Sequence, residues 1–246
     1  MAQQARAIVT RAAIVRGAAI VFQNRGYGST SLADVCHESG VTKGALYFHF
    51  DSKEALARAI IEAQHEASSS VGQALLASTT PGLNAMIVMS LEIARQLHDD
   101  PVVSAGIRLT IEAANFDSPV AGPYLDWMAA CEELLRRAID QGDVCTTLDV
   151  VPTAHFIISA FTGVQVVSDV LTARADIEQR LIEMWAMLLP ALVPAARLAA
   201  LTELPARIRS ERAGAAHRLA TETETETETQ IETADRADAA APVLLG

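Results

Sequence analysis

The chain has few aromatic residues, few cysteines and no long apolar run. Phe, Trp and Tyr make up 4% of its 246 residues although 50% are hydrophobic, so a core must be built from Ala, Val, Leu and Ile. The three cysteines lie far apart without CxxC spacing, which favours reduced thiols packed in a core and a cytoplasmic location. Arg6, Arg11 and Arg16 interrupt the N-terminal segment, so we expect no signal peptide. No stretch of about 18 consecutive apolar residues occurs, so we expect no membrane-spanning segment.

Strand patterns and catalytic motifs are also missing. Apolar and polar residues do not alternate in any segment that could be buried, so we expect an all-α protein. The motifs of serine hydrolases, phosphate-binding loops and zinc proteases do not occur. The six histidines are scattered, and His65 is a weak metal or base candidate that we place at the surface. An enzyme is the second class considered, but the sequence predicts no catalytic residue, metal or cofactor.

Helix signals divide the chain into consecutive segments. An apolar stripe predicts a helix over residues 6–24, with Gly26 as its left-handed cap. The later predicted starts are N-cap residues, and two of them precede a proline in the first turn. The predicted helices run from Thr30 or Ser31 to Gly40, from Thr42 to His49, from Asp51 or Ser52 past residue 65, from Thr80, from Asp100, from the loop 117–123 to residues 141–143, over 149–171 and over 177–189.

Charge is divided unevenly along the chain. The formal net charge is −11, which on its own argues against binding to nucleic acid. Residues 1–50 nevertheless contain five Lys or Arg against two Asp or Glu, and residues 66–198 contain seven against 16. Screening limits each patch to about 8 Å at physiological salt, so a basic N-terminal end can still dock on a polyanion while the acidic body faces away from it.

Residues 30–50 predict two short helices joined by a tight Gly40-Val41 turn, the proportions of a helix-turn-helix. The first turn of the second helix offers the Thr42 hydroxyl, the Lys43 cation, the bare backbone of Gly44 and the Ala45 methyl. Lys43 can reach a guanine edge or a phosphate, and Tyr47 and His49 can donate to phosphates. The alternative is a helical hairpin within an ordinary bundle, but an exposed Lys-Gly pair at a helix start disfavours it.

These residues also resemble a known family. Gly40-Val41-Thr42-Lys43-Gly44-Ala45-Leu46-Tyr47-Phe48-His49-Phe50, followed by Ser52-Lys53-Glu54, is similar to the TetR family of one-component repressors. The stretch is typical of the γ-butyrolactone autoregulator receptors of Streptomyces-like actinobacteria. Asp126-Trp127, 161–165 and 183–185 resemble that branch more loosely. The resemblance covers residues 6–195 and adds Lys53 as a DNA contact.

The resemblance implies an all-α homodimer that binds a palindromic double-stranded DNA operator and is released by a γ-butyrolactone-like inducer. It divides the chain into a helix-turn-helix domain (1–50), a ligand-binding and dimerisation domain (51–198) and a tail (199–246). The helix over 149–171 is apolar on more than one face, which predicts burial on both sides. We therefore expect the dimer interface on this helix and the next, through Phe156, Val164, Val167, Leu181 and Trp185.

Three residues of the body are candidate ligand contacts. Gln64 lies on the apolar face of its helix, Trp127 begins an apolar stripe, and Thr162 lies in the apolar helix. A lactone with an alkyl chain requires an apolar slot and a few donors, which these residues could supply. Their ordinary roles are an exposed Gln, a core Trp and a Thr bonded to its own helix. The candidate apolar lining is Met86, Val88, Leu91, Ile107 and Leu109.

The sequence is equally compatible with other inducers, namely a butenolide, a furan acid or an antibiotic, and with control of an efflux pump.

After Pro205 we expect order to end. Residues 221–229 alternate Thr and Glu without one apolar side chain, so we expect a solvated acidic tail. A tail that competes with DNA for the basic domain is the alternative.

Overall fold

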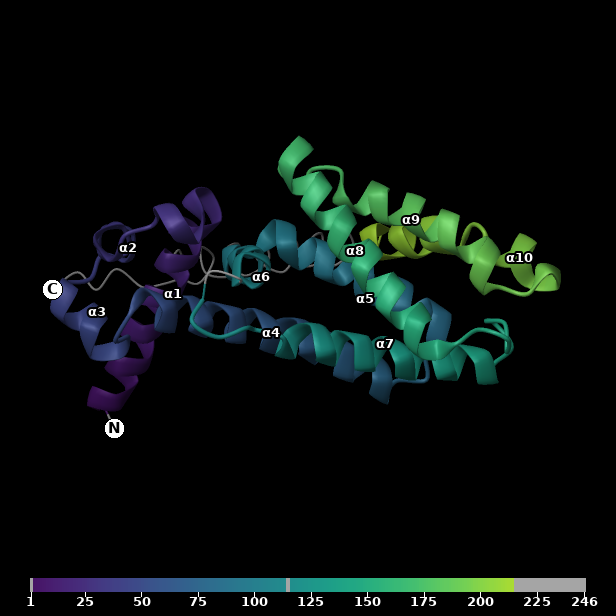
Figure 1. The fold of residues 1–246 in the computed structure, drawn as a ribbon, viewed down its shortest axis with the longest axis horizontal. Helices are drawn as coiled ribbons and strands as arrows, with labels where there is room; N and C mark the ends of the chain where they lie inside the picture. The colour runs from purple at the N-terminus through teal and green to yellow at the C-terminus, as the bar shows by residue number, and fades with distance from the viewer. Residues whose placement is uncertain (1, 114–115, 215–246) are drawn as a thin grey trace, which may run out of the picture. The chain divides into compact units, whose positions relative to one another are not determined.

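The computed structural model describes residues 2–113 and 116–214, and all regular structure within them is helical, which confirms the predicted all-α class (Figure 1). Residues 2–202 and the segment that begins at residue 203 form separate compact units. The helices of the first unit are α1 (Ala2–Ser29), α2 (Leu32–Ser39), α3 (Lys43–His49), α4 (Lys53–Ala77), α5 (Gly82–Asp99), α6 (Pro101–Glu112), α7 (Gly122–Asp140), α8 (Val150–Thr172), α9 (Ile177–Leu192) and α10 (Ala195–Leu201).

Side-chain caps set the boundaries of α2, α3 and α4 where the sequence predicts them. Ser31 and Asp34 form a reciprocal capping box at the start of α2. Gly40 ends α2 in the left-handed conformation with φ 66°. The Thr42 hydroxyl accepts from the Ala45 amide at 3.2 Å, and of the two candidate caps for α4 it is Ser52 whose side chain caps the helix. The short α3 is therefore fixed at its N-terminal end by its own sequence.

The prediction that α1 ends at a left-handed Gly26 cap is wrong. Gly26 has φ 74° and ψ 172°, outside the left-handed helical region, and the helix resumes to Ser29 after this kink. The break is stabilised by α6, because the Tyr27 amide donates to Glu112 Oε2 at 2.8 Å and Arg108 Nη1 donates to the Gln23 carbonyl at 2.7 Å. A Cβ atom at Gly26 would lie 2.8 Å from Arg108 Nη2. Glycine is favoured here by its backbone conformation, whereas the Arg108 side chain, as the end of a flexible chain, could shift to admit a Cβ atom.

The N-terminal helices share one core with the body. Phe22 of α1, Val35 of α2, Leu46 of α3, Leu56 of α4 and Leu109 of α6 are each fully buried in the same apolar cluster. The helices α1–α3 are therefore attached to α4 and α6 by continuous packing.

Two further boundaries differ from the prediction. Pro81, not Thr80, precedes the first residue of α5, and the helix has no side-chain cap. Residues 204–214 are helical, so the expectation that order ends after Pro205 is wrong for this segment. Pro205 lies in the first turn of this helical segment. A proline costs little stability there, because the amide hydrogen that it lacks would have no partner in the first turn. The Thr-Glu stretch 221–229 lies outside the described residues.

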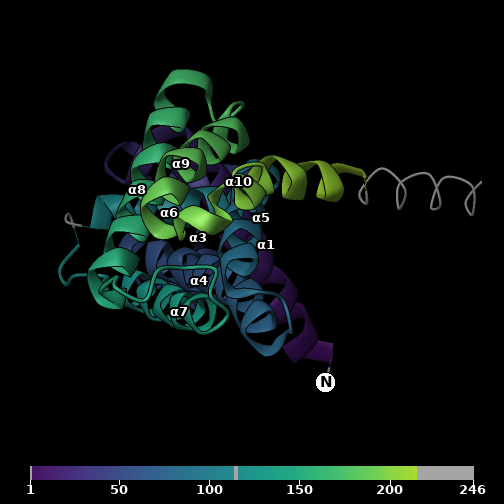
Figure 2. The same ribbon diagram turned by 90° about the vertical axis from the view of Figure 1, so that its right-hand side faces the viewer.

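The helices of the body pack side by side. In Figures 1 and 2, α4 and α7 run along each other, and α8 packs against α7 and against α9. The α6 helix packs on α4, and α5 contacts α4, α6, α7 and α9. Arg137 of α7 donates to the Leu75 and Ser78 carbonyls, so it joins α7 to the C-terminal end of α4. Gly106 lets α6 approach α4 closely, since a Cβ there would meet Gln64 Cβ at 2.3 Å.

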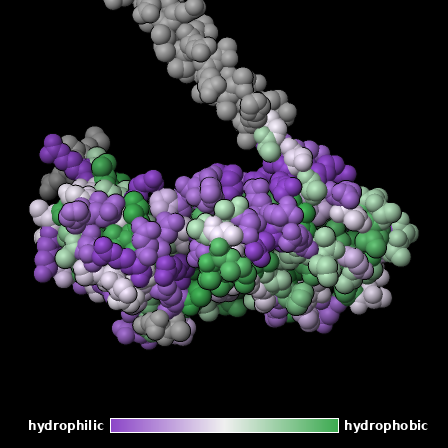
Figure 3. Space-filling model, turned by 90° about the horizontal axis from the view of Figure 1, so that it is seen from above, coloured by the Kyte–Doolittle hydropathy of each residue, from purple (hydrophilic) through white to green (hydrophobic). Residues whose placement is uncertain are grey.

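The α8 helix is long and apolar enough to cross a membrane by length and composition, and 17% of its most apolar window is buried. This low burial differs from the predicted burial on both sides. Apolar side chains gather on the surface that α8 and α9 form (Figure 3). Val167, Val170 and Leu171 of α8 and Met187 of α9 are 46%, 78%, 64% and 81% exposed. A contiguous apolar face of this kind marks an interaction surface.

Candidate functional site: a DNA-facing helix and an internal cavity

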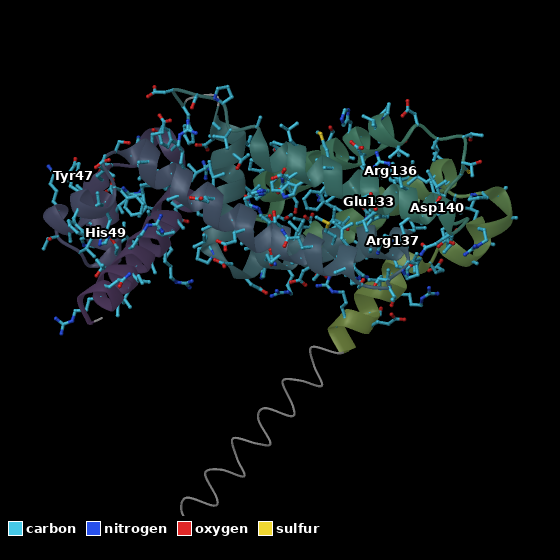
Figure 4. All side chains as sticks on the ribbon, turned by 90° about the horizontal axis from the view of Figure 1, so that it is seen from below. Tyr47, His49, Glu133, Arg136, Arg137 and Asp140 are labelled. Carbon is cyan, nitrogen blue, oxygen red and sulfur yellow. The ribbon has the colours of Figure 1, made fainter. Side chains whose placement is uncertain are left out.

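The α3 helix presents polar groups to solvent at the end of the molecule remote from the C-terminal part of α7. Figure 4 shows Tyr47 and His49 at this end and Arg136 and Arg137 at the other. Thr42, Lys43 and Gly44 are exposed and Ala45 is half-buried. The Lys43 ammonium lies 5.8 Å from the centroid of the Tyr47 ring. The predicted groove-facing residues therefore share one accessible surface.

Phe48 was not among the predicted residues, although it is 80% exposed. It lies next to His49, with their ring centroids 5.1 Å apart. Its position between Tyr47 and His49 could have identified it, because an apolar side chain that no core covers suits a thymine methyl group or a sugar.

The Lys53 ammonium also has partners within the chain, and its contact with DNA stays a prediction. The ammonium donates to the Tyr27 carbonyl at 2.8 Å and to the Thr30 carbonyl at 3.1 Å. It also lies 4.3 Å from the centroid of the Tyr27 ring. Lys53 therefore joins the start of α4 to the end of α1 through the Tyr27 carbonyl, and to the residues between α1 and α2 through the Thr30 carbonyl.

An internal cavity of about 50 Å³, partly open to solvent, lies in the body between α5, α6, α7, α8 and α9. Its wall is apolar, sulfur-rich and contains both tryptophans of the chain. The lining residues are Met86, Met89, Ser90, Ile93, Ile107, Trp127, Cys131, Leu134, Ile157, Ile158, Phe161, Met184 and Trp185. Burial, and secondarily the Glu132 carboxylate, raise the pKa of Cys131 to about 12, so its thiol stays protonated and acts as an apolar wall group.

The cavity includes part of the predicted lining. Met86, Ile107 and Trp127 line it, whereas Val88, Leu91 and Leu109 do not. On α5 the wall residues are spaced by three or four positions from Met86, so Val88 and Leu91 lie on other faces of the helix. Leu109 is fully buried in the core shared with α1 and α4. The same spacing from Met86 could have identified Met89, Ser90 and Ile93.

Gln64 and Thr162, which were predicted as ligand contacts, do not line the cavity. The Thr162 hydroxyl donates to the Ile158 carbonyl at 2.9 Å, the ordinary role of a helical threonine, and its neighbour Phe161 lines the cavity instead. Gln64 is fully buried, and its Nε2 donates to Ser68 Oγ at 3.0 Å. Its Oε1 is a buried acceptor without a hydrogen-bond partner, which is costly unless a ligand or water supplies a donor.

Trp127 connects the cavity to α4. Its indole Nε1 donates to Ser68 Oγ at 3.3 Å, and the same oxygen accepts from Gln64. On the opposite wall, Trp185 Nε1 donates to Ser90 Oγ at 3.0 Å. Displacement of the Trp127 ring would therefore break a hydrogen bond to the helix that begins directly after α3.

A second, larger hollow lies on the outer side of Trp127. This α4–α7 groove has a volume of about 1010 Å³ and is lined by Glu62, His65, Glu66, Ser69, Ser70, Gly72, Gln73, Leu76, Met89, Asp126, Trp127, Ala129 and Ala130. Trp127 and Met89 line both hollows. His65 Nε2 lies 2.9 Å from Asp126 Oδ2, which joins the middle of α4 to the start of α7. Within the described residues, no three His, Cys, Asp or Glu side chains are grouped to hold a metal ion.

The predicted dimerisation residues separate into two groups. Phe156 and Val167 are 61% and 46% exposed, and Val164 is half-buried. Leu181 is fully buried and Trp185 is 1% exposed, so these two residues pack inside the chain and the prediction for them is wrong. The exposed Met187 is the apolar residue that α9 offers instead.

Comparison with known proteins gives two family matches. Residues 14–60 match the model of bacterial regulatory proteins of the tetR family, and residues 80–194 match that of a tetracyclin repressor-like C-terminal domain. The A-factor receptor protein of Streptomyces griseus is 36% identical over 192 residues, which cover 78% of this chain and 67% of that protein.

Solved structures agree with these matches. The crystal structure of a gamma-butyrolactone receptor (ArpA-like protein) aligns with a TM-score of 0.72 and 36% identity, over 84% of this chain and 99% of that one. CprB from Streptomyces coelicolor, in complex with its operator sequence, aligns with a TM-score of 0.70, 36% identity and the same coverage.

Proposed function

This chain belongs to the tetR family of bacterial regulatory proteins, and from that premise we propose that it is a ligand-responsive repressor of transcription. It binds a palindromic operator through α3 and is released by a small γ-butyrolactone. Similar chains are receptors for A-factor and for gamma-butyrolactones, and one similar structure concerns the control of antibiotic production. We extend this role to the present chain, and we propose that it acts in the cytoplasm.

The proposal rests on the presence of two features in one chain, an exposed polar helix and an apolar cavity. Exposed Lys43 and Tyr47 lie on a short capped helix, and an apolar cavity with two tryptophans lies in the body. A site of this kind takes an apolar small molecule without formal charge. A lactone with an alkyl chain has this chemistry.

Release of DNA follows from movement of α4 and α6, which connect the cavity to the N-terminal helices α1–α3. Ile107 of α6 lines the cavity, and the adjacent Arg108 donates to the Gln23 carbonyl of α1. Trp127 hydrogen-bonds to Ser68 of α4. A ligand that enlarges the cavity displaces both helices and with them α3. A shift from 99:1 to 1:99 in favour of the released state requires about 5.5 kcal/mol of differential binding.

We further propose that a second copy of this chain covers the exposed face of α8 and α9. Two copies place two α3 helices on one operator, with half-sites about 34–36 Å apart on B-DNA. An isologous pair gives a palindromic operator. This use of α8 accounts for its apolar composition and low burial within one chain.

Selection from random DNA tests the DNA-binding part of the proposal. We expect the wild-type chain to enrich a palindrome and to bind it with a strong dependence on salt. The Lys43→Ala/Tyr47→Ala double variant should lose this specific binding while its melting temperature is unchanged, because both side chains are exposed. Specific binding retained by the double variant would contradict the assignment of α3 as the reading helix.

A further inference from the structure

The two hollows that meet at Trp127 have complementary sizes and chemistry. The internal cavity measures about 50 Å³, whereas an apolar cavity of about 150 Å³ is needed for a molecule the size of benzene. At this volume the cavity is too small to enclose a whole lactone with an alkyl chain. The α4–α7 groove is roomy, and the ionisable side chains of Glu62, His65, Glu66 and Asp126 line it beside apolar ones. Trp127 and Met89 line both hollows and contribute to the wall between them.

We propose that the inducer spans this wall, with its apolar end in the internal cavity and its polar end in the α4–α7 groove, where His65 recognises it. The inference rests on the proposed function, which names the lactone, and adds where its polar end lies. The cavity wall cannot provide that recognition, because the Trp127 and Trp185 indoles already donate to Ser68 and Ser90.

His65 fits this task by position and by chemistry. Its ring centroid lies 6.0 Å from that of Trp127, so a ligand atom that passes the indole edge comes close to the imidazole. Its Nε2 faces Asp126 Oδ2 at 2.9 Å. The Asp126 side chain is 68% exposed and that of His65 is 23% exposed. A hydrogen bond to so exposed a partner contributes little, so a lactone carbonyl can replace Asp126 as the acceptor at small cost.

This exchange would also act on α4. Arg137 holds the C-terminal end of α4 through the Leu75 and Ser78 carbonyls, and the His65–Asp126 contact holds its middle. Loss of the second contact removes one link between α4 and α7 and leaves the first as a pivot, and any tilt of α4 about it carries along α1, which Lys53 and the shared core tie to α4. Recognition of the polar end and release of the DNA would then be one event.

The groove also predicts a selectivity. Glu62, Glu66 and Asp126 line it, so a carboxylate in the place of the lactone ring would meet carboxylates of the same charge. Opening of the ring by hydrolysis produces such a hydroxy acid. We expect the chain to bind the closed lactone and to reject its hydrolysed form.

Intrinsic fluorescence tests the inference without knowledge of the operator, because both tryptophans line the cavity. The probes are γ-dodecalactone, its hydrolysed form and n-octane, which has the chain without the ring. We expect His65→Leu to weaken γ-dodecalactone binding about tenfold, the value of one hydrogen bond, and to leave octane binding unchanged. His65→Gln, which keeps a donor, should restore lactone binding to within about threefold.

Ser70→Ala is the matched control, because Ser70 lines the same groove but donates to the Ala67 carbonyl of its own helix. Equal lactone binding by His65→Leu and wild type would overturn the inference and leave the proposed function intact. Equal loss of lactone and octane binding would also overturn it, since the effect would not concern the polar end. If no γ-lactone of any chain length bound wild type, the proposed function would fail and the inference with it.

Discussion

At the scale of single residues, the chemistry of a side chain was predictable from sequence but its partner was not. Lys43 and Lys53 both follow a capping hydroxyl residue and both read as DNA contacts. Lys43 lies on an exposed turn, whereas the Lys53 ammonium is bound by the Tyr27 and Thr30 carbonyls. The difference comes from the kink at Gly26, which brings these carbonyls to α4 and has no local signal in the sequence beyond the glycine itself.

Lys53→Met tests this distinction. We expect the free energy of unfolding to fall by about 1–3 kcal/mol, because two carbonyls lose a charged donor. Lys43→Met should leave the free energy of unfolding unchanged and weaken DNA binding. Chemical denaturation and DNA titration of the two variants separate the roles, and a Lys53→Met chain of full stability would contradict the structural role.

At the scale of elements, starts marked by a capping side chain were predictable, because the cap is local. Ser31, Thr42, Ser52 and Asp100 cap helices as expected, whereas α5 begins without a side-chain cap and was misplaced by one residue. The apolar composition of α8 was equally visible. Which of its apolar residues face inward depends on the packing of α7 and α9, and that could not be read from the pattern.

The coupling between α6 and α1 is also an element-scale property. Arg108 contacts α1 at Gln23 and pairs with Glu112, while its neighbour Ile107 faces the cavity. We expect Arg108→Met to bind γ-dodecalactone as wild type does, but to lose about fivefold or more of the effect of the lactone on DNA affinity.

Arg95→Met is the control for this variant, because Arg95 makes similar ion pairs within α5 alone. DNA titrations with and without saturating lactone measure the coupling. An unchanged ratio of the two affinities in Arg108→Met would show that the signal does not pass through this contact.

At the scale of the whole molecule, the proposal requires a second copy on α8 and α9. Val170→Asp places a charge on a residue that is 78% exposed in one chain. We expect it to dissociate the dimer, because a carboxylate buried in an apolar interface is strongly unfavourable. Leu125→Asp on α7, where the side chain is 63% exposed, should leave the dimer intact. Light scattering decides between them, and a dimeric Val170→Asp chain would contradict the assigned interface.

The cavity was the part of the site least accessible to sequence reasoning. Trp127, Met86 and Ile107, predicted as ligand contacts, line the cavity, and so does Trp185, which was predicted at the dimer interface. Both tryptophans lie on apolar stripes of their helices. Whether such a stripe lines the cavity or forms a dimer interface depends on how the five helices pack, which the sequence does not show. Gln64 was placed correctly on the apolar face of α4, yet its amide bonds to Ser68 behind Trp127.

The central claim is that a lactone bound at Trp127 releases the operator. Fluorescence anisotropy of the selected palindrome, titrated with γ-dodecalactone in the presence of wild type and of Trp127→Ala, tests it most directly. We predict release of the DNA from wild type, and a midpoint at least about tenfold higher for Trp127→Ala, because the variant loses the aromatic wall that the ligand contacts. Equal release by the two proteins, or no release from wild type by any γ-butyrolactone, would contradict the claim.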